Sequence, residues 1–166
     1  GTDNHILFNI GNRQGESGAV KDAYVTYTAD GHIEGWVITM PEYVKKYQPG
    51  ATVPLYFSAV LDRKPESYGS FHGNTQLADA KESKGTGAGM YFTFSNEQQE
   101  AVTAKIGLSY TSVENARINL QTEAEGKTFE DAKEQAHQIW QEYLGRIEVE
   151  TSKREDKVKF YTGLYH

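Results

Sequence analysis

A run of glycines at residues 85–89, Gly-Thr-Gly-Ala-Gly, is the first candidate for ligand chemistry in this sequence. A phosphate-binding loop must lead into a helix, because the amides of the first helical turn bind the anion. The residues that follow, Met90 to Phe94, have the apolar and aromatic character of a strand. The glycines therefore indicate a flexible hairpin or strand connection and not a nucleotide site.

Histidine and cysteine give no metal site by spacing. The five histidines, His5, His32, His72, His137 and His166, are never separated by the few residues that place two ligands on one metal ion. The chain contains no cysteine, which excludes disulfides, thiolate metal sites and cysteine nucleophiles. We therefore predict no metal ligand and no cofactor within these residues.

Two carboxylate pairs have the residue types of a glycosidase site, in which two acids flank the scissile bond. Glu148 and Glu150 are expected on one face of a short strand, and Glu130 and Asp131 in a first helical turn, where negative charge favours the helix dipole. Both pairs have a structural explanation, and no serine lies in a nucleophile elbow. We predict no catalytic residue in this chain.

Aromatic side chains remain as binding candidates, because exposed rings stack on the apolar faces of sugars. Tyr43, Tyr47 and Tyr68 are the substrate-binding candidates, since they lie in polar stretches flanked by proline and glycine. Rings on strands more often fill a core. We therefore expect core positions for the other rings of this region, Trp36, Tyr56 and Phe71.

Composition restricts the class of protein. The 166 residues are 37% hydrophobic with a net charge of −6, which predicts a globular chain with a real core. The acidic charge argues against nucleic acid or an anionic membrane surface as a partner. No apolar run reaches the length of a membrane span, and the first residues do not resemble a signal peptide.

The first two-thirds of the chain predict an antiparallel β-sandwich. Apolar alternation, β-branched residues and intervening turn residues predict strands, and Asp30-Gly31 between two of them predicts a hairpin. The expected strands are His5–Ile10, Ala23–Thr28, His32–Thr39, Val53–Leu61, Gly89–Phe94 and Glu100–Tyr110. The loop Lys81–Gly89 is the segment expected to be mobile.

The last third changes to a helical period. Ser112 is expected to cap a short helix, and Thr128 a longer one that ends at Gly145. A short strand, residues 146–150, would follow. The fold class expected is mainly β, or α+β by content, with a sandwich at residues 1–111 and a helical linker segment at 112–166.

The final helix is expected to begin at Ser152, with Glu155 completing a capping box. Its apolar side chains cover more than half of its circumference, so it needs a covering surface that this chain does not obviously supply. We expect it to be disordered or covered by another copy, and the chain to be part of a larger protein. The side chains concerned are Val158, Phe160, Tyr161, Leu164 and Tyr165.

One continuous pattern in the last sixty residues resembles a known family. It runs through the strand and Ser-x-x-x-Ala helix of residues 106–116, Trp140 and Leu144, and the element Phe-Tyr-Thr-Gly-Leu-Tyr-His of residues 160–166. The order and spacing are similar to those of the exo-acting α-mannosidases of glycoside hydrolase family 92. Upstream, residues 56–65 are similar to the family's strand that ends in an Arg-Pro pair, with Lys64 inserted between Arg63 and Pro65.

The resemblance implies a supersandwich-type N-terminal domain, linking helices and a helical-barrel catalytic domain of an α-1,2-mannosidase. Such an enzyme removes terminal α-linked mannose from glycans with inversion, using calcium and carboxylates of the barrel. This chain would hold the later part of the sandwich, the linking helices and the first barrel helix. The catalytic residues and calcium ligands would lie beyond His166, and the protein would be periplasmic or extracellular.

Three hypotheses remain open. The first is a non-catalytic part of such a mannosidase, whose partners are the barrel domain of the same chain and mannose-containing glycans. The second is a free-standing carbohydrate-binding sandwich that uses the loop tyrosines. The third is an interaction domain for another partner.

Overall fold

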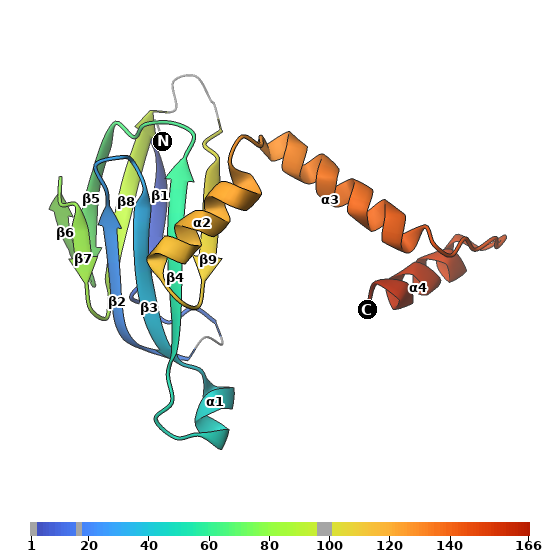
Figure 1. Ribbon diagram of the computed structural model, residues 1–166, viewed down its shortest axis with the longest axis horizontal. Coiled ribbons are helices and arrows are strands. Elements are labelled where there is room, and N and C mark those ends of the chain that lie inside the picture. Colours follow the sequence, from blue (N-terminus) through green and yellow to red (C-terminus); the bar gives the residue numbers. More distant parts are fainter. Residues whose placement is uncertain (1–2, 16–17, 96–100) are drawn as a thin grey trace. The chain divides into compact units, whose positions relative to one another are not determined.

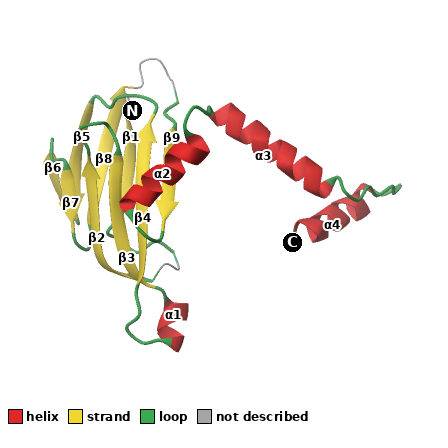
Figure 2. Cartoon of the chain, in the orientation of Figure 1, coloured by secondary structure: helices red, strands yellow, loops and turns green. Residues whose placement is uncertain are grey.

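The computed structural model describes residues 3–15, 18–95 and 101–166 (Figure 1). They belong to two compact units, Gly1–Glu125 and Gly126–His166. The first unit holds all the described strands and two helices, and the second holds two helices (Figure 2).

The first unit is a sandwich of two antiparallel sheets, as predicted. Along the four-stranded sheet the order is β1 (Asp3–Asn9), β8 (Ala88–Ser95), β5 (Ser67–His72) and β6 (Thr75–Ala78). Along the five-stranded sheet it is β7 (Glu82–Lys84), β2 (Ala19–Tyr27), β3 (Ile33–Met40), β4 (Val53–Leu61) and β9 (Ala104–Ser109).

Four helices complete the described residues. The short α1 (Glu42–Tyr47) lies between β3 and β4, and α2 (Val113–Ala124) follows β9 and crosses the outer face of β3 and β4 (Figure 1). The second unit contains α3 (Phe129–Leu144) and α4 (Arg154–Tyr165). Ser112 caps α2 and Thr128 forms a capping box with Asp131 at the start of α3, so both predicted helix starts are confirmed.

The predicted hairpin at Asp30-Gly31 joins β2 to β3. Gly31 has a φ of 87°, and its amide donates to the Thr28 carbonyl. Asp30 does not share the positive φ that a two-residue type I′ turn requires. The Thr28 side chain instead supports a longer turn by bonding to the backbone of His32.

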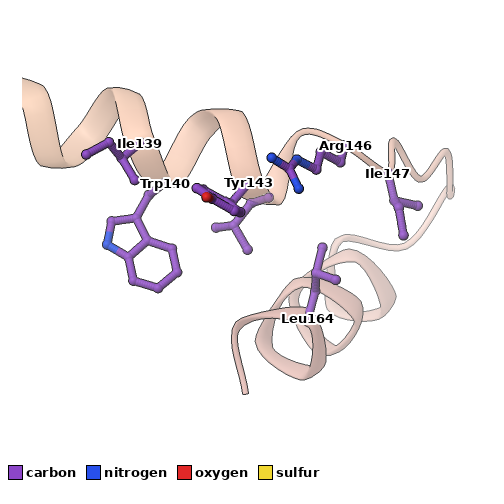
Figure 3. A pocket seen from close by; sticks show the side chains of 7 residues that line it. Ile139, Trp140, Tyr143, Arg146, Ile147 and Leu164 are labelled. Carbon is purple, nitrogen blue, oxygen red and sulfur yellow. The ribbon is translucent and has the colours of Figure 1, made fainter.

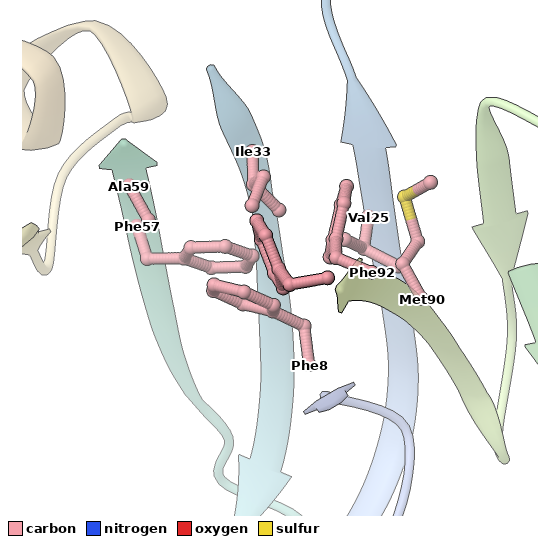
Figure 4. Close-up of a cluster of buried hydrophobic side chains, with 8 residues drawn as sticks. Phe8, Val25, Ile33, Phe57, Ala59, Met90 and Phe92 are labelled. Atoms are coloured by element: carbon pink, nitrogen blue, oxygen red, sulfur yellow. The ribbon is translucent and has the colours of Figure 1, made fainter. Parts of the chain in front are cut away.

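The core lies between the two sheets (Figure 4). Phe8 stacks on Phe57 at 6.2 Å and meets Phe92 edge-on at 5.8 Å. Alternation explains this core, because residues opposite each other on antiparallel strands share one face of the sheet. The buried members of the cluster are Phe8, Val25, Ile33, Phe57, Ala59, Met90, Phe92 and Phe94.

One inward-facing surface of the sandwich is open. Ile106 and Leu108 lie opposite Ala59 and Phe57 in register, so they face inward, yet each is 53% exposed. The four-stranded sheet ends at β1, whose Phe8 packs on β4. Within the described residues, no strand opposes the inner face of β9.

Several predicted elements differ in the structure. The strand predicted at residues 146–150 is wrong, because this segment has no partner strand to complete its backbone hydrogen bonds. The last helix begins at Arg154 with Lys153 as N-cap and no side-chain cap, so the capping box of Ser152 is also wrong. Residue 100, the predicted start of β9, lies outside the described residues.

Strands β5, β6 and β7 and helix α1 were not predicted. Polar residues and glycine give β5 weak strand propensity, and its pairing with β8 stabilises it. The segment 81–89, expected to be mobile, contains β7, which pairs with β2. Gly85 and Gly87 connect β7 to β8, and Gly89 lies within β8, so the strand-connection interpretation is confirmed.

We predict that two inward-facing positions differ sharply in their effect on stability. Phe92→Ala should lower the free energy of unfolding by about 3–5 kcal/mol, because it leaves a cavity in the core. Leu108→Ala should cost less than about 1 kcal/mol, since that side chain is already half exposed. Urea unfolding of the chain measures both, and equal losses would contradict the open edge at β9.

Candidate functional site

A polar cluster joins α2 to the β2–β3 hairpin. Arg117 Nε donates to Glu34 Oε1 at 2.7 Å, and another guanidinium nitrogen donates to Asp30 Oδ2 at 2.8 Å. Ser58 Oγ also donates to Glu34 Oε1, at 2.8 Å. Because this uses the hydroxyl proton, His32 Nδ1, 3.0 Å away, is the donor to Ser58 Oγ.

These contacts hold both carboxylates in the ionised state. The Thr28 hydroxyl and the Arg117 guanidinium lower the pKa of Asp30 to about 2. Burial opposes ionisation of Glu34, but the hydrogen bonds from Arg117 and Ser58 outweigh it, so the pKa of Glu34 lies below its ordinary value. The same bonds, that to Glu34 first, raise the pKa of Arg117.

The cluster is suited to positioning and not to acid–base catalysis. A general acid at neutral pH needs a raised carboxyl pKa, and both of these are lowered. No group of three or more His, Asp or Glu side chains that could hold a metal ion occurs within the described residues. The described residues therefore offer no cluster of carboxylates that could hold a calcium ion.

The two carboxylate pairs that the sequence suggested as glycosidase candidates do not belong to the Arg117 cluster. Glu130 pairs with Lys133 at 3.0 Å, and Asp131 bonds to the backbone amide of Thr128. Glu148 and Glu150 are exposed in the segment between α3 and α4. Glu130 and Asp131 thus have the helix-start role that the sequence indicated.

The three tyrosine candidates are not brought together. Tyr43 and Tyr47 lie on α1 and are 69% and 81% exposed. Tyr68 lies on β5, half-buried against the core, with its ring 5.0 Å from that of Tyr27. Two of the candidates are therefore accessible to a ligand, and the third is used in packing.

Register places several other rings on outer faces, so their predicted core positions are wrong. Tyr24 pairs with Trp36, and Trp36 with Tyr56, on the face opposite the core residue Phe57. Phe71 lies on the outer face of the other sheet, because it pairs with Gly89, which alternates with the core residues of β8. Their aromatic character alone did not reveal which face they occupy.

An apolar groove runs along the open side of the sandwich. It has a volume of about 420 Å³ and lies next to the exposed inner face of β9. Of the three tyrosines predicted from the sequence to bind a ligand, Tyr43 lines this groove, and the other two do not. Other lining residues come from several strands, including Val20, Val37, Leu55, Ile106 and Leu108.

A second apolar hollow, of about 540 Å³, lies within the helical unit (Figure 3). Trp140 of α3 contacts Tyr165 of α4 with ring centroids 4.8 Å apart. Arg146 covers the ring of Tyr143 at 4.3 Å. The hollow is lined by Trp140, Tyr143 and Arg146 together with Ile139, Leu144, Ile147 and Leu164.

No residue of α3 or α4 is buried in the described structure. Val158, Leu164 and Tyr165 are exposed, and Phe160 and Tyr161 are half-buried. The helical unit therefore presents an apolar surface that is suited to packing against further protein. None of the described helices has the length and apolar character to cross a membrane.

Comparison with known families matches two consecutive domains to this chain. The glycosyl hydrolase family 92 N-terminal domain matches residues 1–109, and the catalytic domain of the same family matches residues 115–166. The chain belongs to glycosyl hydrolase family 92. Its sandwich is the family's N-terminal domain, and its last fifty residues align with part of the catalytic domain.

Solved structures of family 92 share the fold. An inverting mannosidase of Bacteroides thetaiotaomicron aligns with a TM-score of 0.76 and 21% identity over 98% of this chain. An α-mannosidase of the same species aligns over 89% of the chain with a TM-score of 0.74 and 24% identity. A third glycosyl hydrolase of the family gives a TM-score of 0.75 and 24% identity over 97% of the chain.

The chain spans about a fifth of the length of these relatives, 20%, 20% and 21% respectively. No curated protein matches the sequence. The boundary predicted between residues 111 and 112 falls between the two family 92 matches. The compact sandwich unit nevertheless extends to Glu125, because α2 packs on β4 and β9.

The polar cluster predicts that the free energies of unfolding of the unchanged chain and of an Arg117→Met variant differ by an amount that depends on pH. Removing the guanidinium leaves Glu34 partly buried without its cation, so the free energy of unfolding near pH 7 should fall by about 2 kcal/mol. Both carboxyl pKa values are lowered by folding, so their contribution is present above about pH 5 and is lost as the pH falls toward about 2. The difference between the two proteins should narrow over that range.

Urea unfolding at pH 7, 5, 4 and 3 measures this difference. Lys45→Met is the matched control, because it removes only the exposed pair with Glu42 at 4.0 Å and should change stability by less than about 0.5 kcal/mol. If the free energies of unfolding of Arg117→Met and the unchanged chain differ by the same amount at every pH, the ionised state of Asp30 and Glu34 does not contribute to stability as predicted.

Proposed function

We propose that this chain is the non-catalytic sandwich and the first helices of the catalytic domain of an inverting α-mannosidase. The whole protein would remove terminal α-linked mannose from glycans, as an α-1,2-mannosidase in glycan degradation. The observation that carries this proposal is the pair of family 92 matches in consecutive order. The structural relatives described as mannosidases support it.

The catalytic chemistry would come from polypeptide outside residues 1–166. Inversion needs two carboxylates about 6.5–9.5 Å apart with a water between them. The carboxylates with lowered pKa values, Asp30 and Glu34, are occupied by Arg117. A calcium ion, if the whole enzyme uses one, would likewise be held by residues outside the described chain.

The partner of the helical unit would be the remainder of the catalytic barrel in the same polypeptide. The exposed apolar side chains of α3 and α4 support this, because a helix pair of this size cannot bury them alone. We also propose a periplasmic or extracellular location, where mannose-containing glycans are accessible.

We predict that the chain of residues 1–166 will not hydrolyse an α-linked mannobiose, with or without calcium. The parent protein should release mannose under the same conditions, with inversion at the anomeric carbon. Release of mannose is measured by chromatography, and the anomer formed first by NMR. Turnover by the chain alone that is abolished by Glu34→Gln would contradict the non-catalytic assignment.

The second candidate function is carbohydrate binding through the tyrosines of α1. Their large exposed fraction favours this candidate. If it is correct, calorimetric titration with mannose oligosaccharides should give saturable binding that is lost in Tyr43→Ala. Tyr68→Phe is a suitable control, since the ring remains packed on Tyr27. Absence of heat, or unchanged binding in Tyr43→Ala, would exclude this site.

A further inference from the structure

The outer face of the four-stranded sheet carries two aromatic rings at paired positions. Phe71 on β5 lies opposite Gly89 on β8, and Tyr91 on β8 lies opposite Gly69 on β5. These pairs alternate with the core positions of the same strands. Both rings therefore lie on the face that points away from the sandwich interior.

Each ring lies over the glycine opposite it. A Cβ atom at Gly89 would come within 3.0 Å of three ring atoms of Phe71, and one at Gly69 would come equally close to the phenol end of Tyr91. The glycines thus let the rings extend along the sheet, with one face covered by backbone. The other side stays accessible, since both residues are only half-buried.

Polar side chains surround these rings. A hollow of about 550 Å³ is lined by Phe71 and Tyr91 together with His5, Leu7, Asn74 and Gln76. His5 Nδ1 lies 3.1 Å from Thr93 Oγ1, which orients the imidazole and leaves Nε2 for another partner. The amides of Asn74 and Gln76 can both donate and accept hydrogen bonds.

This face is nearly free of charge. Strand pairing shows which side chains of β1, β8, β5 and β6 point outward. From residue 5 onward, none of these described side chains is Asp, Glu, Lys or Arg. A chain with a net charge of −6 has placed its charges elsewhere. An uncharged, hydroxyl-rich ligand complements this surface, whereas an anionic ligand would find no Lys or Arg at these described strand positions.

We propose that this outer face binds a pyranose ring of a neutral oligosaccharide. The rings of Phe71 and Tyr91 would contact the apolar C–H face of the sugar. His5, Asn74 and Gln76 would bond to its hydroxyl groups. The hollow falls within the usual volume range of small-ligand sites. The proposal concerns binding alone and does not depend on hydrolysis by the parent protein.

The rings also have a structural role, because they cover glycines that would otherwise weaken the strands. Phe71→Leu separates the two roles. Leucine still covers Gly89 with an apolar side chain but offers no flat aromatic surface. Binding should therefore weaken about tenfold while the fold is retained.

The test is an NMR titration of the chain with α-linked mannotriose and, separately, maltotriose at millimolar concentrations. We expect saturable shifts centred on Phe71 and Tyr91 with at least one of the two sugars, and a dissociation constant about tenfold higher in Phe71→Leu. Phe129→Ala, which removes an exposed ring on α3, should bind as the unchanged chain does. Should Phe71→Leu fail to fold, Gln76→Ala must weaken binding instead.

No saturable shift with either sugar, or equal binding by Phe71→Leu, would overturn the proposal. Shifts centred on Trp36 of the other sheet would also overturn it. Because the measurement involves no turnover, these outcomes are independent of whether the parent protein hydrolyses mannosides.

Discussion

The bond between Arg117 and Glu34 determines how this chain is organised. It joins a helix to a hairpin 83 residues earlier, and together with the buried side chains of Ala116 and Leu120 it makes α2 part of the sandwich. Gly107 permits the contact, because a Cβ at this position would collide with the backbone of Ala116. A glycine on β9 and a partly buried ion pair thus hold α2 on the sandwich, whose compact unit ends at Glu125.

Local patterns predicted the elements whose stability is local. The caps at Ser112 and Thr128 and the alternation of β4 and β9 depend on neighbouring residues, and the structure agrees with them. Strand β5 and the segment 146–150 depend on the presence or absence of a partner strand. Sequence periodicity contains no information about that partner, so these two predictions failed in opposite directions.

The same limit applies to the sites. Arg117 and Glu34 are adjacent only after the sandwich forms, so no spacing in the sequence could have paired them. The face occupied by Phe71 was predictable in principle, because β8 alternates glycine and tyrosine with buried side chains. That signal required knowing that β5 pairs with β8 in this register. Aromatic content alone favoured the core and was misleading.

The two outer faces of the sandwich differ in charge and in whether a helix covers them. The outer face of the five-stranded sheet holds Glu34 and receives Arg117, so the charge of Glu34 is neutralised by a helix of the same chain. The outer face of the other sheet has no helix packed on it in the described residues, and it exposes uncharged groups. Water solvates isolated charges well but gains little from aromatic rings. An uncovered face that keeps Phe71 and Tyr91 at glycine-lined positions therefore retains apolar surface that a ligand can bury.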